Sequence, residues 1–321
     1  MKKSAIGLLA LLFILTAIPI DALGADYLVP GGQVIGLQLT DDSVTVAAFD
    51  HAMEVAKKGG LQIGDEIVSI DEKIIDTAQD VRDALIRSAG QIEMVIRRQR
   101  QTHRLTIHPQ ITADGPKLGV YLKEGVTGIG TVTWYDPDTG DFGTLGHGVH
   151  DRTGALLDMV SGQIFDAKVL SVKAGQVGAP GQLRGGIDGQ KVIGTIRRNT
   201  AKGVFGKSDV AFSGSALPVA AAADIRTGSA TILSTVEGSH VLEYSVEILK
   251  LYPEAKDTGR NMLLHITDQR LLDTTGGIVQ GMSGSPIIQD GKLVGAVTHV
   301  LVNDPTRGYG IFIENMLEAA S

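Results

Sequence analysis

The sequence predicts a mainly β protein made of two folded units. The chain has 321 residues, which is enough for about two domains that each bury their own core. Glycine fills 41 of these positions, roughly twice its average share, and such frequent turn residues disfavour long helical bundles. In the second half, short apolar runs alternate with turn residues, without intervening helices of about ten residues or more. This spacing favours an antiparallel sandwich or barrel over a parallel α/β sheet.

The composition excludes several kinds of chemistry. The chain has no cysteine, which removes disulfides, thiol nucleophiles and cysteine-held metals, and leaves Ser, Thr, His, Asp, Glu and Lys to carry any catalysis. The formal net charge is -7 and no long basic run is present, so nucleic acid is not an expected partner. Because aromatic residues make up only 4% and hydrophobic residues 43%, we expect a core of Val, Ile, Leu and Ala.

Residues 1–24 have the pattern of an export segment. Lys2 and Lys3 precede an uncharged run over residues 4–20, and small residues follow it. A basic start, an apolar run and a small-residue exit are typical of a signal peptide, although the run also approaches the roughly 17 residues of the shortest membrane spans. We therefore expect the rest of the chain to be exported across the cytoplasmic membrane. It is then either secreted after cleavage near Gly24 or held as a membrane-anchored protein by this segment.

Residues 30–111 form the first predicted unit. Its expected elements are a strand at 34–39, a short helix at 51–58, an amphipathic helix at 78–89 and a strand at 92–97. The order of these elements, and above all the run GLQIGDEIVSIDEKIIDTAQDVRDAL at 60–85, resembles a PDZ domain. The resemblance implies a PDZ-like α/β module ahead of the second unit.

The PDZ resemblance also implies peptide binding. PDZ domains take up an extended peptide as an added strand, between one strand and one helix, with backbone amides near a GLGF-like turn receiving a terminal carboxylate. In this chain that turn would be Val34, Ile35, Gly36 and Leu37. The alternative is that the module only packs against its neighbour as a spacer.

The second predicted unit spans residues 119–321 and contains a specific serine motif. Ser283 lies in the run Gly-Met-Ser-Gly-Ser-Pro, which is followed by two apolar runs joined by an Asp-Gly turn, the pattern of a β-hairpin. Small neighbours let the Ser283 hydroxyl project from a tight turn, and the N–H groups of Gly281 and Ser283 can converge as an oxyanion hole. The motif resembles the nucleophile loop of chymotrypsin-like serine peptidases, which implies an antiparallel β-barrel.

An α/β-hydrolase elbow is the competing catalytic interpretation of this motif. That elbow requires glycine where Ser285 stands, and it requires a catalytic histidine after the serine, where only His299 is available. The sequence therefore favours the chymotrypsin-like interpretation.

A serine nucleophile needs a base, and His147 is the best candidate. It stands between Gly146 and Gly148 at an expected strand end, where an imidazole can reach across a cleft. His150 follows three positions later, but no glutamate lies between the two histidines and no third ligand is evident, so a metal site is not expected. No cofactor is expected either.

Two aspartates are candidates for the residue that orients the imidazole. Asp268 ends an apolar strand and lies 283 - 268 = 15 positions before the serine. Asp209 also precedes an apolar strand and lies at a more conventional distance from Ser283.

The whole set of motifs resembles the SpoIVB serine peptidases of endospore-forming bacteria. The resemblance rests on the export segment, residues 28–32, the PDZ-like unit, Leu-Gly-His at 145–147, Thr-Asp at 267–268 and the run TGGIVQGMSGSPIIQDGKLVGAVTHVLVNDPTRGYGIFIENML. It implies a serine endopeptidase with His147 as base, Asp268 as orienting residue and Ser283 as nucleophile.

The same resemblance implies a place and a substrate. The family acts in the forespore intermembrane space, where it cleaves its own N-terminal segment. It then cleaves a protein substrate that regulates an intramembrane protease complex, and a late sigma factor matures as a result. A catalytically inactive PDZ scaffold is the non-enzymatic alternative.

Overall fold

The structure, a computed structural model, describes residues 27–321 apart from 89, 152–153 and 256–257. The export segment expected at residues 1–24 lies outside the described residues. Within the described part of the chain, no helix is both long enough and apolar enough to cross a membrane.

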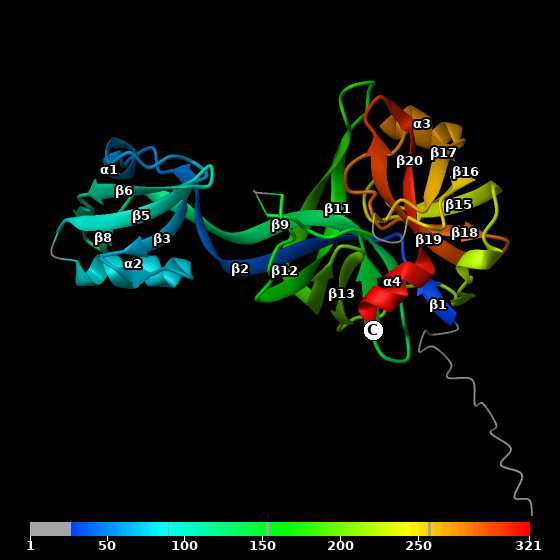
Figure 1. The fold of residues 1–321 in the computed structure, drawn as a ribbon, viewed down its shortest axis with the longest axis horizontal. Helices are drawn as coiled ribbons and strands as arrows, with labels where there is room; N and C mark the ends of the chain where they lie inside the picture. Colours follow the sequence, from blue (N-terminus) through cyan, green and yellow to red (C-terminus); the bar gives the residue numbers. More distant parts are fainter. Residues whose placement is uncertain (1–26, 89, 152–153, 256–257) are drawn as a thin grey trace, which may run out of the picture.

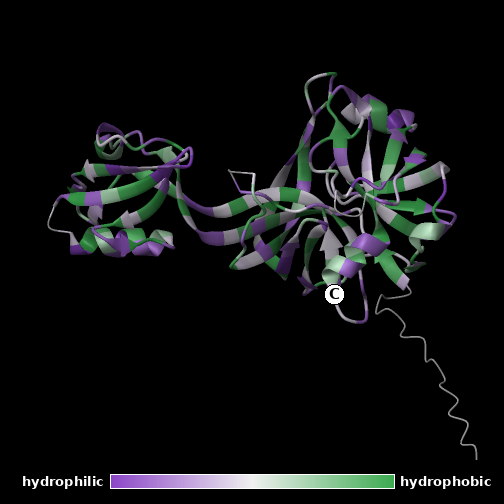
Figure 2. Ribbon diagram, in the orientation of Figure 1, coloured by the Kyte–Doolittle hydropathy of each residue, from purple (hydrophilic) through white to green (hydrophobic). Residues whose placement is uncertain are grey.

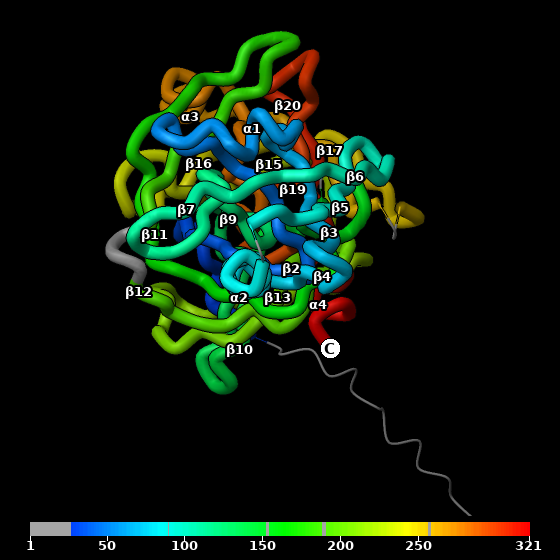
Figure 3. The backbone as a smooth tube through the Cα atoms, turned by 90° about the vertical axis from the view of Figure 1, so that its left-hand side faces the viewer, coloured from blue at the N-terminus to red at the C-terminus, as the bar shows by residue number. Residues whose placement is uncertain are grey.

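Two long antiparallel strands organise the molecule. β2 (Val34–Phe49) and β9 (Val120–Tyr135) each have 16 residues, and β2 pairs along its length with residues 120–131 of β9. Figure 1 shows a small unit on the left and a larger one on the right, with these two strands running from one to the other. Figure 3 looks along that direction, so that the small unit stands in front. The small unit is therefore an insertion between two strands of the large one.

The small unit has its own elements and its own core. Its elements are α1 (Val55–Lys58), β3 (Glu66–Ile70), β4 (Lys73–Ile74), α2 (Ala78–Arg87), β5 (Ile92–Arg98), β6 (Gln101–Ile107), β7 (Gln110–Thr112) and β8 (Gly115–Lys117). Thr77 caps α2 in a reciprocal capping box with Asp80, which explains why the helix starts there. Hydrophobic and hydrophilic residues alternate along the strands (Figure 2), and in β5 the side chains of Ile92, Met94 and Ile96 are buried.

The boundary expected at residue 30 needs correction. β1 (Tyr27–Pro30) and the first half of β2 belong to the large unit, where Ile35 and Leu37 pack with Val132 and Phe142. Sequence alternation predicts a strand at 34–39, but it does not reveal that the same strand continues into a second domain. The small unit begins only in the second half of β2, and the β7–β8 hairpin lies around residue 111, the expected end of the first unit.

The large unit has two halves. In the first half, the main sheet brings together β1, β2 and β9 with β10 (Asp141–Thr144), β11 (Ser161–Lys173), β12 (Gln182–Thr200), β13 (Gly203–Ser208) and β14 (Leu217–Pro218). The second half is a closed antiparallel barrel of β15 (Gly228–Ser234), β16 (Leu242–Leu251), β17 (Met262–Ile266), β18 (Pro286–Gln289), β19 (Lys292–Leu301) and β20 (Asp304–Phe312). The helical segments of the large unit are η1 (Ala222–Asp224), α3 (Gln269–Thr275) and α4 (Ile313–Ala320). The mainly β fold with an antiparallel barrel is thus confirmed.

The C-terminal helix α4 fixes the two halves against each other. Its buried residues Ile313 and Met316 pack with Trp134 and Phe205 of the first half and with Leu293 of the barrel. Because burial of each large apolar side chain stabilises by about 1.5–3 kcal/mol, this shared core holds the loops of the two halves in register.

Candidate active site

The nucleophile loop connects α3 to β18 and places two serines in different environments. Ser283 is half-buried, and its hydroxyl donates a hydrogen bond to the carbonyl of Thr298 in β19 at 2.9 Å. Ser285 is fully buried, and its hydroxyl bonds the hydroxyl of Ser234 at 3.0 Å. Only Ser283 can therefore reach a substrate without rearrangement of the barrel.

Strand β9 of the first half clamps the nucleophile loop of the barrel. The Thr131 N–H donates to the Ser283 carbonyl at 3.1 Å, and the Thr131 hydroxyl donates to the Gly281 carbonyl at 2.8 Å. The Thr133 hydroxyl donates to the Gly284 carbonyl at 2.8 Å. No local pattern points to these two threonines, since their role depends on a loop about 150 positions away in the chain.

The clamp leaves the two expected oxyanion donors available. Among the described residues, the N–H groups of Gly281 and Ser283 have no hydrogen-bond acceptor, whereas the neighbouring N–H groups of Met282 and Gly284 each have one. Free amides beside a serine hydroxyl are what an oxyanion hole requires. The geometry is therefore compatible with the predicted pair of donors.

Gly284 brings the serine loop against the histidine loop. Its φ is +97°, and a Cβ there would lie 2.0 Å from the Thr131 oxygen and 2.6 Å from the Leu145 nitrogen. Only glycine fits such an approach. Leu145 immediately precedes Gly146 and His147, so this contact sets the distance between the two reactive loops.

His147 follows β10 in a turn with left-handed backbone angles at Leu145 and Gly146, whose φ values are 70° and 68°. The His147 Nδ1 lies 2.9 Å from the Gly148 carbonyl. Because a carbonyl can only accept, this contact assigns the proton to Nδ1 and leaves Nε2 as the free acceptor. That is the tautomer a general base needs.

Burial keeps the imidazole neutral. Desolvation lowers the pKa of His147, the Gly148 carbonyl partly opposes this, and the nearby His150 lowers the pKa further. A histidine with a lowered pKa is unprotonated at neutral pH and is ready to accept the serine proton.

Asn199 holds the loop that follows His147, a role that the sequence did not indicate. Its amide donates to the carbonyls of Val149 and Leu157, and its side-chain oxygen accepts from the Val149 N–H, each at 2.9 Å. An asparagine near a strand end is common in turns, so its type alone predicts nothing.

The structure does not bring Asp268 to His147. Asp268 is the N-cap of α3, where its carboxylate accepts from the N–H groups of Arg270 and Leu271 and from that of Ser245. The Arg270 guanidinium lies 2.8 Å away and is the main reason that the pKa of Asp268 falls to about 2. The expected orienting role finds no contact in this structure: the strand-end position starts a helix, and no hydrogen bond joins Asp268 to His147 among the described residues.

The alternative candidate, Asp209, does not supply that group either. Its side chain is exposed beyond β13, and its N–H pairs with the Ile193 carbonyl. No hydrogen bond connects Asp209 to His147 in the described part of the chain. The same part contains no cluster of three metal-ligating side chains.

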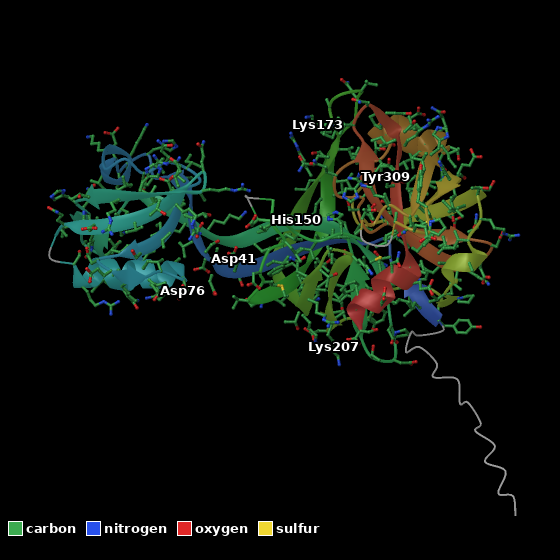
Figure 4. All side chains as sticks on the ribbon, in the orientation of Figure 1. Asp41, Asp76, His150, Lys173, Lys207 and Tyr309 are labelled. Carbon is green, nitrogen blue, oxygen red and sulfur yellow. The ribbon has the colours of Figure 1, made fainter. Side chains whose placement is uncertain are left out.

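A second histidine lies against the base. The ring centroids of His147 and His299 are 5.3 Å apart, at an interplanar angle of 41°. Burial is the main cause that lowers the pKa of His299 to about 4, and His147, Arg260 and His150 add to it. Figure 4 labels His150 of the first half and Tyr309, the residue in β20 that pairs with His299.

The residues expected to bind peptide in the PDZ-like unit also need correction. Val34 to Leu37 lie in the middle of a sheet, paired with β9 on one side, and Ile35 to Leu37 also pair with β11 on the other. Their backbone groups already have partners, so no peptide strand can be added there. The expected turn is continuous strand.

An open strand edge occurs elsewhere in the small unit. In the described structure, residues 120–124 of β9 pair with β2 alone. The start of helix α2 lies beside this stretch, because the Ala78 N–H donates to the Glu124 carboxylate at 2.5 Å. The run Leu118-Gly119-Val120 leads into this edge, and Gly119 has a φ of +71°. A strand edge beside a helix is the arrangement that accepts a peptide as an added strand.

The antiparallel barrel, the projecting serine, the neutral histidine and the free amides define the class of a β-barrel serine peptidase. The sequence profile of the family described as SpoIVB peptidase S55 matches residues 114–317. The chain belongs to the SpoIVB peptidase S55 family.

Comparison with known proteins gives more distant similarities. A protein of Rhizobium meliloti (strain 1021) with the name "Putative zinc metalloprotease" is 28% identical over 228 residues, which are 69% of this chain and 55% of that protein. The chain thus spans about half the length of this curated relative.

Two kinds of solved structure are similar to parts of the chain. The PDZ domain of the SdrC-like protein from Listeria monocytogenes is 21% identical and covers 25% of this chain and 87% of its own, with a TM-score of 0.23. Two crystal structures of the inactive Rv3671c protease from M. tuberculosis H37Rv are 14% identical with TM-scores of 0.35. They cover 60% of this chain and 82% and 81% of their own.

Proposed function

We propose that this protein is a serine endopeptidase in which Ser283 is the nucleophile and His147 the general base. The observation that carries the proposal is the clamp of Thr131 and Thr133 on the serine loop, which leaves the Gly281 and Ser283 amides free beside a half-buried hydroxyl. An unused Gly/Ser turn has no need of such a constraint.

The reaction follows from these positions. Ser283 Oγ turns away from the Thr298 carbonyl and attacks the scissile carbon, while its proton passes to His147 Nε2. The carbonyl electron pair moves to the oxygen, which accepts hydrogen bonds from the free Gly281 and Ser283 amides. His147 then gives the proton to the leaving amine, and water hydrolyses the acyl-enzyme by the same route. In this proposal the hydrogen bond between Ser283 and His147 forms when substrate binds, because catalytic hydrogen bonds are often long without substrate.

The proposed substrates are the chain's own N-terminal segment and a regulator of an intramembrane protease complex. Family membership supports the regulator as a substrate. In this proposal the chain is exported to the forespore intermembrane space, and its cleavage of the regulator leads to maturation of a late sigma factor. For the first, Gly31 and Gly32 donate their N–H groups to the carbonyls of Thr133 and Val132 in β9. The stretch directly after β1 therefore lies along the strand that clamps the serine loop.

The PDZ-like unit is proposed to hold substrate during cleavage. Its open edge at residues 120–124 belongs to the same strand as Thr131 and Thr133. A peptide added to that edge would be tethered to the strand that carries the catalytic clamp. Tethering raises cleavage of protein substrates more than that of short peptides, because remote binding energy is available only to the larger ones.

The test uses the purified full-length chain and maps new termini by mass spectrometry. Wild-type protein should produce defined fragments, Ser283→Ala should produce none, and Ser285→Ala should retain cleavage although its buried hydrogen bond to Ser234 is lost. Fragments that persist in Ser283→Ala would overturn the proposal, and a wild-type chain that yields no fragments would favour the inactive PDZ scaffold instead.

A further inference from the structure

The hairpin of β11 and β12, from the first half of the large unit, contacts the nucleophile loop directly before the oxyanion glycine. The Gln280 N–H donates to the Gly181 carbonyl at 3.0 Å, and the Leu183 N–H donates to the Gln280 carbonyl at 2.8 Å. Gln182 lies opposite Gln280 in this parallel bridge. The hairpin therefore holds both backbone groups of the residue that precedes Gly281.

The hydrogen bond from Leu183 fixes the direction of one oxyanion donor. The Gln280 carbonyl and the Gly281 N–H belong to the same planar trans peptide unit, so they point in opposite directions. A carbonyl that is held toward Leu183 keeps the Gly281 N–H on the other side of that unit, where it has no acceptor among the described residues. This is the orientation in which the N–H can bind a substrate oxygen.

Gly281 allows this peptide unit to turn over. Its φ is +99°, and glycine accepts this value about as readily as the negative value that a turned unit would require. A turned unit would direct the Gln280 carbonyl, in place of the Gly281 N–H, toward the oxyanion. Because the glycine backbone accepts both orientations, a hydrogen bond from outside the loop is needed to select the one with the donor.

The second oxyanion donor is held from within its own loop. The Ser283 N–H shares a peptide unit with the Met282 carbonyl, which accepts from the Ser285 N–H at 3.0 Å. Its direction is thus set by a turn of the nucleophile loop. Gly281 differs, because the hydrogen bond on its peptide unit comes from a strand of the other half.

We propose that the Leu183 N–H is the positioning group of the oxyanion hole and that it selects the orientation of the Gln280–Gly281 peptide unit in which the hole is complete. The inference rests on the proposed function, since it concerns the oxyanion hole of that reaction. Leu183 is 1% exposed, and a Cβ at Gly281 would lie 3.0 Å from its Cβ, so the donor is held firmly against the loop. The hole of the barrel therefore forms only when the hairpin of the first half is in place.

The experiment replaces the Leu183 amide by an ester in the full-length chain, through incorporation of the α-hydroxy acid of leucine. This change removes the N–H and keeps the side chain, and the ester oxygen repels the Gln280 carbonyl. With a fluorogenic peptide copied from the wild-type self-cleavage site, kcat should fall by about 10²-fold and KM should stay within about twofold, because an oxyanion donor acts mainly in the transition state.

A matched control is an ester at Gly178 in the same hairpin. It removes a hydrogen bond of the same length to the barrel, from the Gly178 N–H to the Val302 carbonyl at 2.8 Å. It should keep kcat within about threefold. A folded Leu183 ester with the wild-type kcat would overturn the inference. Equal losses of kcat in the two esters, or a change in KM alone, would also overturn it, since neither result assigns the bond to the transition state.

Hydrogen exchange in the wild-type chain tests the same bond without a variant that has to fold. A peptide boronate copied from the residues before the cleavage site forms a tetrahedral adduct on Ser283, and an oxygen of the adduct requires the Gly281 N–H. By linkage the adduct stabilises the bond from Leu183, so exchange of the Leu183 N–H should slow by at least about threefold, and that of the Gly178 N–H should not. Exchange at Leu183 that is unchanged by the boronate would overturn the inference.

The two proposals fail separately. If Ser283→Ala is inactive while the folded Leu183 ester keeps the wild-type kcat, this inference fails and the proposed function stands. A wild-type chain that neither cleaves nor forms the adduct overturns both.

Discussion

Replacement of Asp268 by Asn separates a capping role from a catalytic one. Asn caps a helix about as well as Asp, so the hydrogen bonds to the Arg270 and Leu271 N–H groups can be kept. What is lost is the ion pair with Arg270, whose effect is visible in the pKa of Asp268, which falls from 3.8 to about 2. A shift of this size corresponds to at most roughly 2.4 kcal/mol. Because the Arg270 side chain is 67% exposed, solvent screening reduces the expected loss to about 1–2 kcal/mol.

The assay combines thermal unfolding with peptide hydrolysis. In a domain of 150–250 residues, 1 kcal/mol shifts Tm by roughly 2–4 °C, so Asp268→Asn should unfold a few degrees earlier at pH 7. The pKa of Asp268 is lowered on folding, so its contribution is present above pH 3.8 and is lost as the pH falls toward 2. The difference in Tm should therefore shrink in acid, and kcat should stay within about threefold. A fall in kcat of ~10⁴ with an unchanged Tm would refute this reasoning and restore Asp268 as the orienting residue.

Three further predictions address the loops, the histidines and the small unit. Gly284→Ala should abolish peptide hydrolysis and lower the free energy of unfolding by more than about 3 kcal/mol, because the added Cβ would lie 2.0 Å from the Thr131 oxygen. The control Gly291→Ala should lower it by only about 1 kcal/mol, because Gly291 has a φ of +73° but open space around it. The pKa of His299 is lowered to about 4 on folding, so the unfolded chain takes up a proton at this residue at a higher pH than the folded chain does. The free energy of unfolding should therefore fall by about 3 kcal/mol as the pH drops from 6.5 toward 4. In urea titrations, His299→Gln should reduce this dependence of stability on pH. Tyr121→Asp on the open edge of β9 should slow cleavage of a protein substrate more than of a short peptide, and Ile111→Asp, on the similarly exposed side of β7, should not. Equal loss for both substrates would contradict a docking role.

Much of the fold could be predicted because it follows from patterns of neighbouring residues in the sequence. The capped helix after Thr77 and the hairpin after Ser283 depend on neighbouring residues, and both are found where the sequence places them. The insertion of the small unit could not be predicted, because it depends on the pairing of β2 with β9, whose registered residues lie up to about a hundred positions apart. Alternation predicts a strand at 34–39 but does not name its partners.

In the candidate active site, too, local sequence patterns predict some residues and not others. Ser283 and His147 stand out because glycines surround them, and the structure places their loops in contact through Gly284. For Asp268 a local signal points to a different role: it precedes a helical run that ends at Gly276, the pattern of an N-cap and a C-cap. The orientation of His299 depends on how β19 meets a loop of the other half, and no local pattern encodes that contact.

The reactivity of Ser283 is the most direct test of the account. Full-length protein would be treated with a fluorophosphonate, digested, and the modified residue located by tandem mass spectrometry. The account predicts one adduct, on Ser283, that is absent in Ser283→Ala and forms at least about 10²-fold more slowly in His147→Gln. An adduct on another serine, or labelling that persists in Ser283→Ala, would contradict it.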